Sequence, residues 1–151
     1  MPETQFSGRV MDNQIEQELY RALNDLSLFH IATDKSILAR HGLRRVRFFM
    51  LRHLYQNPGI SFSRLGELSF THGASTSRMI YSMEKEGLVQ RQSDENDRRL
   101  SRLSLTEAGK AKYEQANSEL RADIQSRFSS IDPDLLAIIL QNVQTLCEAI
   151  S

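Results

Sequence analysis

Apolar residues recur every three or four positions along the first quarter of the chain, which is the spacing of one face of an α-helix. The recurring residues are Ile15, Leu19, Leu23, Leu26 and Ile37. They predict a long helix from about Asn13 to Arg40, ended by Gly42. Residues 1–12 are mostly polar and show no such period, so we expect a flexible tail before this helix.

The helical spacing returns over residues 46–54 and stops at the turn sequence Asn57-Pro58-Gly59. Ser61 is then a suitable N-cap for a short helix. A tight turn at residues 70–73 separates this short helix from a further helix at about 74–86. Two short helices joined by such a turn form a helix-turn-helix unit.

After residue 87 the period of apolar residues shortens to two. Leu103 and Leu105 alternate with polar residues, as they do in a half-buried strand. Residues 88–93 and 100–105 therefore predict the two strands of a hairpin, with the charged segment 94–99 as its loop.

Two more helices are predicted at the end of the chain. Thr106 is a suitable N-cap for the first, which runs to about Arg127, and Asp132 followed by Pro133 begins the second. Apolar residues lie nearly all round the last helix, and a monomer would expose them, so we expect a dimer interface rather than burial within one chain. Its candidate residues are Ile15, Leu19, Leu136, Ile139, Leu140 and Val143.

The order of these elements is that of a winged helix. We expect a mainly α fold with a small two- or three-stranded β wing, in which a winged helix-turn-helix carries long N- and C-terminal dimerisation helices. One domain would span residues 13–151. The winged unit would occupy about 43–105, and the dimerisation helices about 13–40 and 106–150.

The distribution of charge bears on the partner. Nineteen basic and nineteen acidic residues give a formal net charge of zero. The stretch 38–66, however, contains six arginines and no acid, whereas acids outnumber bases after Thr106. A phosphate responds to the local potential, which is screened within roughly 10 Å, so the zero sum does not exclude DNA as a partner.

Other classes of protein lack their characteristic residues. The single cysteine, Cys147, cannot form an internal disulfide, which indicates a reducing cytoplasm, and its apolar neighbours indicate a packing role. No apolar run is long enough to span a membrane. Without paired cysteines, clustered histidines, a glycine-rich phosphate loop or a nucleophile motif, we expect no metal, no cofactor and no enzymatic activity.

The second helix of the helix-turn-helix unit carries the chemistry of DNA recognition. Small polar side chains and one arginine lie in and before its first turns, and such groups suit base edges and phosphates in a major groove. The alternative is that the serines and threonine are only helix caps. With two serines of the preceding helix, the candidate DNA contacts are Ser61, Ser63, His72, Ser75, Thr76, Ser77 and Arg78.

Two further candidates, Arg98 and Arg99, lie at the hairpin tip. An arginine on a narrow projecting loop can enter a minor groove, where the negative potential is strong. Asp94 and Asp97 would hold the shape of this loop. A solvated charged hairpin is the alternative, and the position of the loop directly after a helix-turn-helix favours DNA contact.

Three segments resemble the MarR family of regulators: MEKEGLVQR at 83–91, DENDRR at 94–99 and LSLTEAGK at 103–110. The resemblance implies a homodimer that binds pseudo-palindromic double-stranded DNA. It also implies base contacts from the helix that carries Arg78, and a minor-groove contact from a wing arginine, with Arg98 the first candidate and Arg99 available to pair with Asp97. Residues 71–74 depart from the sequence that relatives often have there.

We therefore expect a sequence-specific DNA-binding transcriptional regulator, a repressor released by a small aromatic or phenolic effector. Candidate effector-pocket residues are His30, Arg47 and Met50. His30 as a surface or interface residue, and Arg47 as a contact to phosphate or to the partner chain, are alternatives. A winged-helix module that binds protein without binding DNA is the alternative function, and it predicts an apolar recognition face with few charges.

Overall fold

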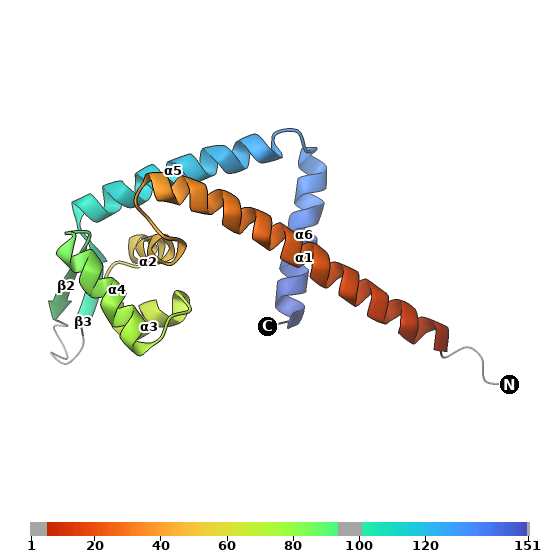
Figure 1. The fold of residues 1–151 in the computed structure, drawn as a ribbon, viewed down its shortest axis with the longest axis horizontal. Coiled ribbons are helices and arrows are strands. Elements are labelled where there is room, and N and C mark those ends of the chain that lie inside the picture. Colours follow the sequence, from red (N-terminus) through yellow and green to blue (C-terminus); the bar gives the residue numbers. More distant parts are fainter. Residues whose placement is uncertain (1–5, 94–100, 151) are drawn as a thin grey trace.

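The computed structural model describes residues 6–93 and 101–150. Its elements follow the predicted order: α1 (Phe6–Arg40), α2 (Arg45–Gln56), β1 (Ile60–Ser61), α3 (Phe62–Leu68), α4 (Gly73–Lys85), β2 (Val89–Ser93), β3 (Ser101–Leu105), α5 (Glu107–Phe128) and α6 (Pro133–Ile150). A mainly helical winged helix-turn-helix with a small β-sheet is confirmed (Figure 1).

The start of α1 differs from the prediction. The helix begins at Phe6 rather than near Asn13, so residues 6–12, assigned to a flexible tail by their polarity, are helical. The apolar period marks only the part of a helix that has a face to bury, whereas the backbone hydrogen-bond ladder continues through polar residues. Phe6 and Val10 lie four positions apart, but one such interval is too short to establish a period, so the predicted boundary was placed too late.

The small sheet is antiparallel, with the strand order β1-β3-β2. Val89 pairs with Leu105, and Ile60 pairs with Leu103 on the other side of the central strand. The sequence left two or three strands open, and the third is the two-residue strand β1, which ends at Ser61. Two residues are too few to show a period of two, so no pattern could locate this strand.

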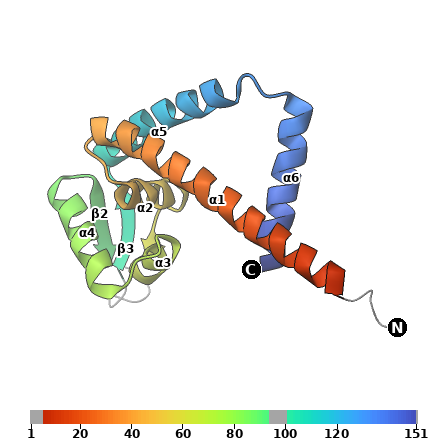
Figure 2. The ribbon, with the colours of Figure 1, turned by 45° about the vertical axis from the view of Figure 1, so that its right-hand side comes forward.

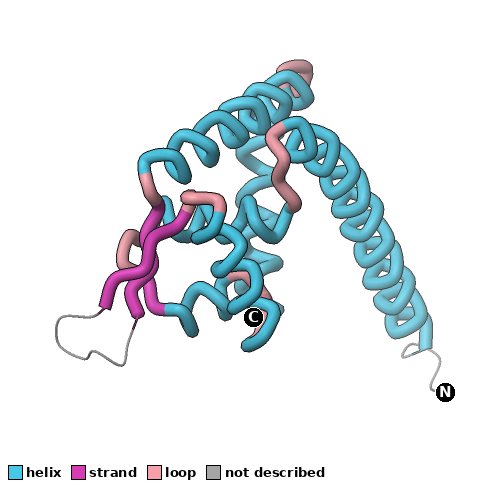
Figure 3. The backbone as a smooth tube through the Cα atoms, turned by 60° about the vertical axis from the view of Figure 1, so that its left-hand side comes forward, coloured by secondary structure: helices cyan, strands magenta, loops and turns pink. Residues whose placement is uncertain are grey.

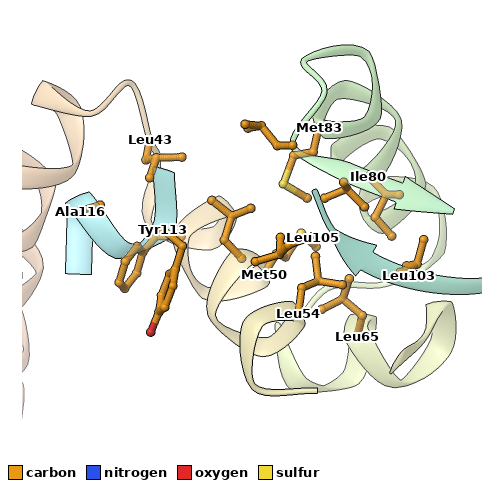
Figure 4. Close-up of a cluster of buried hydrophobic side chains, with 14 of the residues drawn as sticks. Leu43, Met50, Leu54, Leu65, Ile80, Met83, Leu103, Leu105, Tyr113 and Ala116 are labelled. Carbon is orange, nitrogen blue, oxygen red and sulfur yellow. The ribbon is translucent and has the colours of Figure 1, made fainter. Parts of the chain in front are cut away.

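One hydrophobic core joins the helix-turn-helix to the sheet (Figure 4). Met50 and Leu54 of α2 meet Leu65 of α3, Ile80 of α4 and Leu103 of β3. The core continues along α5 through Tyr113, Ala116 and Leu120. Helix α4, the sheet and the first half of α5 therefore pack as one body.

The predicted N-caps are confirmed. The Ser61 hydroxyl accepts a hydrogen bond from the Arg64 amide at 3.2 Å, and Thr106 accepts one from the Gly109 amide at 3.1 Å. Asp132 accepts hydrogen bonds from the amides of Asp134 and Leu135 at 2.9 and 3.1 Å. Each cap satisfies amides that have no partner within the helix, so the sequence sets where α3, α5 and α6 begin.

Helices α1, α5 and α6 form arms that extend away from the winged unit. In Figure 2 they outline a triangle, with α6 crossing the N-terminal half of α1. Figure 3 shows the three strands at the opposite end of the molecule from the N-terminus of α1. Among the described residues, none of these helices combines the length and apolar character that a membrane span requires.

Candidate nucleic-acid interface

The turn between α3 and α4 is closed by its own backbone. The Thr71 amide donates to the Gly66 carbonyl at 2.9 Å, and the Ser69 amide donates to the Leu65 carbonyl at 3.0 Å. The hydroxyls of Thr71 and Thr76 lie 2.8 Å apart and form a hydrogen bond across the turn. These bonds fix the direction in which α4 leaves the turn.

Helix α4 has two distinct faces. Thr76, Ile80 and Met83 are buried against the core. The opposite face carries exposed residues at the spacing of one helical stripe: Ala74, Ser77, Arg78, Tyr81 and Lys85. This exposed stripe, which we call the outer face of α4, is polar and basic and contains no acid.

Thr76 was wrongly predicted as a DNA contact. It is only 1% exposed, and its hydroxyl is bonded to Thr71. Position 76 lies four residues before Ile80, so it shares the buried face of the helix. Its polarity suggested a surface role, but the hydroxyl serves the turn instead.

The start of α4 is open to an anion. No acid lies in its first turn, and His72 at the N-cap position makes no side-chain capping bond. The first amides of a helix have no intrahelical partner and sit at the positive end of the dipole. His72 and Ser75 are exposed beside these amides, as a phosphate contact requires.

Arg78 is exposed on the outer face, and its Nε donates to the carbonyl of Ala74 at 3.3 Å. Tyr81 and Lys85 extend the same face beyond it, and the sequence analysis missed both. Tyr81 is 60% exposed, and the Lys85 ammonium lies 5.5 Å from the centre of its ring. Their positions three and seven residues after Arg78 were the signal that could have found them.

The two serines at the start of α3 differ in their surroundings. The Ser61 hydroxyl caps α3 and is occupied by the Arg64 amide, whereas Ser63 is exposed. On the same helix, the guanidinium of Arg64 is paired with Glu67 at 2.8 Å. Of the two serines, Ser63 is therefore the one that faces solvent.

The predicted wing residues Asp94, Asp97, Arg98 and Arg99 lie outside the described residues, and their roles stay predictions. Of the two strands that flank this segment in the sequence, β2 lies beside α4 (Figure 1). Arg91 of β2 is bonded to Glu84 of α4, with its Nε and Nη2 at 3.0 and 3.2 Å from the two carboxylate oxygens. The base of the wing is thereby tied to α4.

The predicted effector pocket needs correction. Met50 is fully buried in the core, so it cannot line a pocket that is open to a ligand. Arg47 is bonded to Glu86 at 2.7 Å and faces a groove beside Met79. His30 is half-buried on α1, where its ring meets the edge of Phe29. Helical spacing placed Met50 on α2 but could not tell which side of α2 the core covers.

A different pocket, of about 530 Å³, lies between α2 and the turn after α3. Its apolar wall includes Phe49, Leu68 and the 92%-exposed Phe70. Its other lining residues are Arg45, Val46, Arg52, His53 and Ser69. Burial, followed by the charge of Arg52, lowers the pKa of His53 below its ordinary value. We call this the α2–turn pocket.

The candidate dimer residues are accessible in the single chain. Ile15, Leu19, Ile139, Leu140 and Val143 are exposed, Leu136 is half-buried, and no residue of α6 is fully buried. Side chains of α1 and α6, among them Leu19 and Val143, line a common apolar groove. Cys147, for which the sequence indicated a packing role, is exposed on α6.

Comparison with known proteins agrees with this geometry. Residues 43–101 match the model of the MarR family. The homoprotocatechuate degradative operon repressor of Escherichia coli is 28% identical over 114 residues, which cover 76% of this chain and 74% of that protein.

Solved structures have the same fold. A MarR-family regulator from Silicibacter pomeroyi is 25% identical, with a TM-score of 0.70 over 86% of this chain and 88% of that one. The repressor CouR, solved with a 23-mer DNA duplex, has a TM-score of 0.77 at 22% identity, over 89% of this chain and 95% of that one. Its two-faced α4, the strands of its wing and these relatives make the chain similar to the DNA-binding transcriptional regulators of the MarR family, whose family model residues 43–101 match.

Proposed function

We propose that this regulator is a repressor that reads a pseudo-palindromic operator as a homodimer and is released by a small aromatic acid. The proposal that α4 binds DNA rests on the outer face of this helix. It presents a hydroxyl, a guanidinium, a phenol and an ammonium in one stripe. A module that binds protein would need an apolar face with few charges. The outer face of α4 is polar and basic instead.

Arg78 has the reach for a base edge or a phosphate, and Ser77 suits a shorter contact beside it. The amides at the start of α4 add an anion site for the backbone of the same duplex. The wing arginines would contact the adjacent minor groove. CouR, which shares this fold, was solved bound to a DNA duplex, and this supports DNA as the partner.

Dimerisation is supported by the apolar arms. An isolated chain would leave Leu19, Ile139 and Val143 in water, and contiguous exposed apolar surface of this kind usually marks an interface. A two-fold dimer places two copies of α4 about one helical turn of DNA apart, which matches a pseudo-palindrome. We place this dimer in the cytoplasm, where a regulator meets its operator.

The α2–turn pocket is the proposed effector site. An aromatic ring would pack on Phe49 and Leu68, and a carboxylate or phenolate would face Arg45 and Arg52. Because Ser69 and Phe70 line the same pocket, a ligand there would touch the turn that directs α4. Release requires only that the ligand prefer an arrangement of α4 that does not fit DNA.

DNA binding by α4 is tested on duplex fragments of the source genome that the purified protein selects. We expect Arg78→Ala to weaken binding by about 5- to 150-fold, equivalent to about 1–3 kcal/mol, while Arg121→Ala on α5 serves as a control of equal charge. If Arg78 meets a phosphate, the salt dependence also becomes shallower. Unchanged binding by Arg78→Ala would remove this residue from the interface.

The effector site is tested by titrating the protein with homoprotocatechuate and with benzoate, followed by calorimetry and by DNA release. Arg52→Gln should weaken binding of either acid, and Arg121→Gln should not. If both acids release wild type and Arg52→Gln from DNA at equal concentrations, the α2–turn pocket is not the site.

A further inference from the structure

The C-terminal end of α4 carries two acids, each bonded to an arginine of a different element. Glu86, directly after α4, accepts a hydrogen bond from Arg47 of α2 at 2.7 Å. Glu84 accepts two bonds from Arg91 of β2, at 3.0 and 3.2 Å. One end of the recognition helix is therefore held from both sides.

Glu84 and Glu86 lie at the end of the helix where negative charge is unfavourable. The C-terminal end of a helix carries partial negative charge, and basic side chains suit it better. The phosphates of a bound duplex would also repel nearby carboxylates. Neither the stability of α4 nor attraction to DNA explains acids at 84 and 86, whereas their arginine partners do.

Of the two arginines, Arg47 is the more enclosed. The Arg47 side chain is 19% exposed, and its Nε is buried without a hydrogen-bond partner within the described part of the chain. Ser82 donates to the other oxygen of Glu86 at 3.0 Å, so that this carboxylate is held on both sides. The hydrogen bond from Arg47 is the main cause that lowers the pKa of Glu86.

The rest of the contact between α4 and the core is apolar and has little directional preference. Ile80 and Met83 keep one face of α4 turned toward the core, but these apolar contacts define the orientation of the helix less sharply than hydrogen bonds do. Hydrogen-bonded charge pairs are directional. The bond between Thr71 and Thr76 fixes the first turn of α4, and the two arginine–glutamate pairs fix its last.

We propose that Arg47 and Arg91 are positioning residues, which hold the end of α4 between α2 and the wing and so set the angle at which its outer face meets DNA. This inference rests on the proposed reading of DNA by α4 and goes beyond it. In this positioning role, Arg47 contacts neither an effector nor a DNA phosphate.

Glu86→Gln is the decisive variant. Electrostatics alone predicts tighter DNA binding when an acid beside the interface is neutralised. The positioning role predicts weaker binding to the selected operator fragment, by roughly 3- to 30-fold, as expected for a coupled pair. Glu67→Gln on α3 is the matched control, because it also neutralises a paired acid of the helix-turn-helix unit. It should bind as tightly as wild type or more tightly.

A charge swap completes the test. Arg47→Glu with Glu86→Arg keeps the net charge and should recover much of the affinity that either single change loses. Thermal unfolding of every variant confirms that binding is measured on folded protein. Glu84→Gln and Arg91→Gln give the same test for the second pair, between α4 and β2.

The outcomes separate this inference from the proposed function. If wild type fails to bind any genomic fragment, the reading of DNA by α4 is wrong. If wild type binds, and both Glu86→Gln and Glu84→Gln bind as tightly or more tightly, the positioning role is overturned while the reading of DNA stands. A swap that binds both operator and unrelated duplex as weakly as Arg47→Glu would show that Arg47 meets phosphate directly.

Discussion

Gly109 shows how one missing side chain shapes the molecule. A Cβ at this position would lie 2.0 Å from the carbonyl oxygen of Leu88, closer than any real contact. The obstacle is backbone, which cannot swing aside as the end of a flexible side chain can. Glycine therefore lets the first turn of α5 pack directly against the start of the wing.

We expect Gly109→Ala to lower the free energy of unfolding by about 1–3 kcal/mol, because the overpacked contact must push α5 away from Leu88. Chemical denaturation measures this loss. Ser118→Ala, on the same helix and away from this contact, should change it by less than about 0.5 kcal/mol. Equal stability of Gly109→Ala and wild type would contradict the close approach.

Glu119 links α1 to α5 through two partners. Its carboxylate accepts hydrogen bonds from Arg40, through Nε at 3.0 Å, and from His41 at 2.6 Å. Arg40, and after it His41, hold the pKa of Glu119 below its ordinary value of 4.5. Such a group stabilises the folded state above its unfolded pKa, and the stabilisation is lost as the pH falls through the folded pKa.

Glu119→Gln should therefore unfold at a lower temperature than wild type near neutral pH, and the gap should close as the pH falls below 4.5. Thermal unfolding across this range, with Glu148→Gln as the control, measures the gap. A gap that stays constant into acid would exclude the lowered pKa as its cause.

At the scale of elements, the two faces of α4 should respond differently to substitution. Thr76→Val removes the hydroxyl bonded to Thr71 and should cost about 0.5–1.5 kcal/mol of stability, and any loss of DNA binding should accompany this loss of stability. Ser77→Ala on the outer face should leave stability nearly unchanged and weaken DNA binding. Chemical denaturation and gel-shift titration of both variants check these expectations. Loss of stability in Ser77→Ala, with none in Thr76→Val, would contradict the assignment of the two faces.

Elements were predictable where burial imposes a period. The order of the helices, the hairpin and the caps Ser61, Thr106 and Asp132 followed from spacing and side-chain chemistry. The start of α1 and the strand β1 did not, because seven residues with few apolar positions and a two-residue strand are too short to establish a period.

The site was predictable in part for a related reason. Polarity correctly predicted exposed side chains on α4, the candidate DNA-contacting helix, but misplaced Thr76, since a hydroxyl can serve the interior once it has a partner such as Thr71. It also missed Tyr81 and Lys85, which only the helical spacing from Arg78 could have brought in. Met50 failed as a pocket residue because the side of α2 that the core covers depends on tertiary packing.

At the scale of the whole molecule, the proposed dimerisation through α1 and α6 makes a direct prediction. Leu136→Asp with Ile139→Asp would place two charges in the apolar interface, and an unpaired buried charge is costly. We expect a monomer or an unfolded chain by sedimentation equilibrium, with loss of DNA binding. Gln144→Asp, at an exposed polar position of α6, is the control and should stay dimeric. A stable dimer of the double variant would place the interface elsewhere.

The length of α5 has a mechanical consequence. Its 22 residues span about 33 Å, and its first turn is fastened to the wing by Gly109 against Leu88 and by the Thr106 hydroxyl, which donates to the Gly87 carbonyl at 2.5 Å. Helix α5 is therefore a rigid rod that is held at its first turn by the DNA-binding unit. A tilt of about 5° at that end would displace the far end by about 3 Å. A small change in packing at the first turn of α5 would therefore become a larger displacement where the arms of the proposed dimer meet.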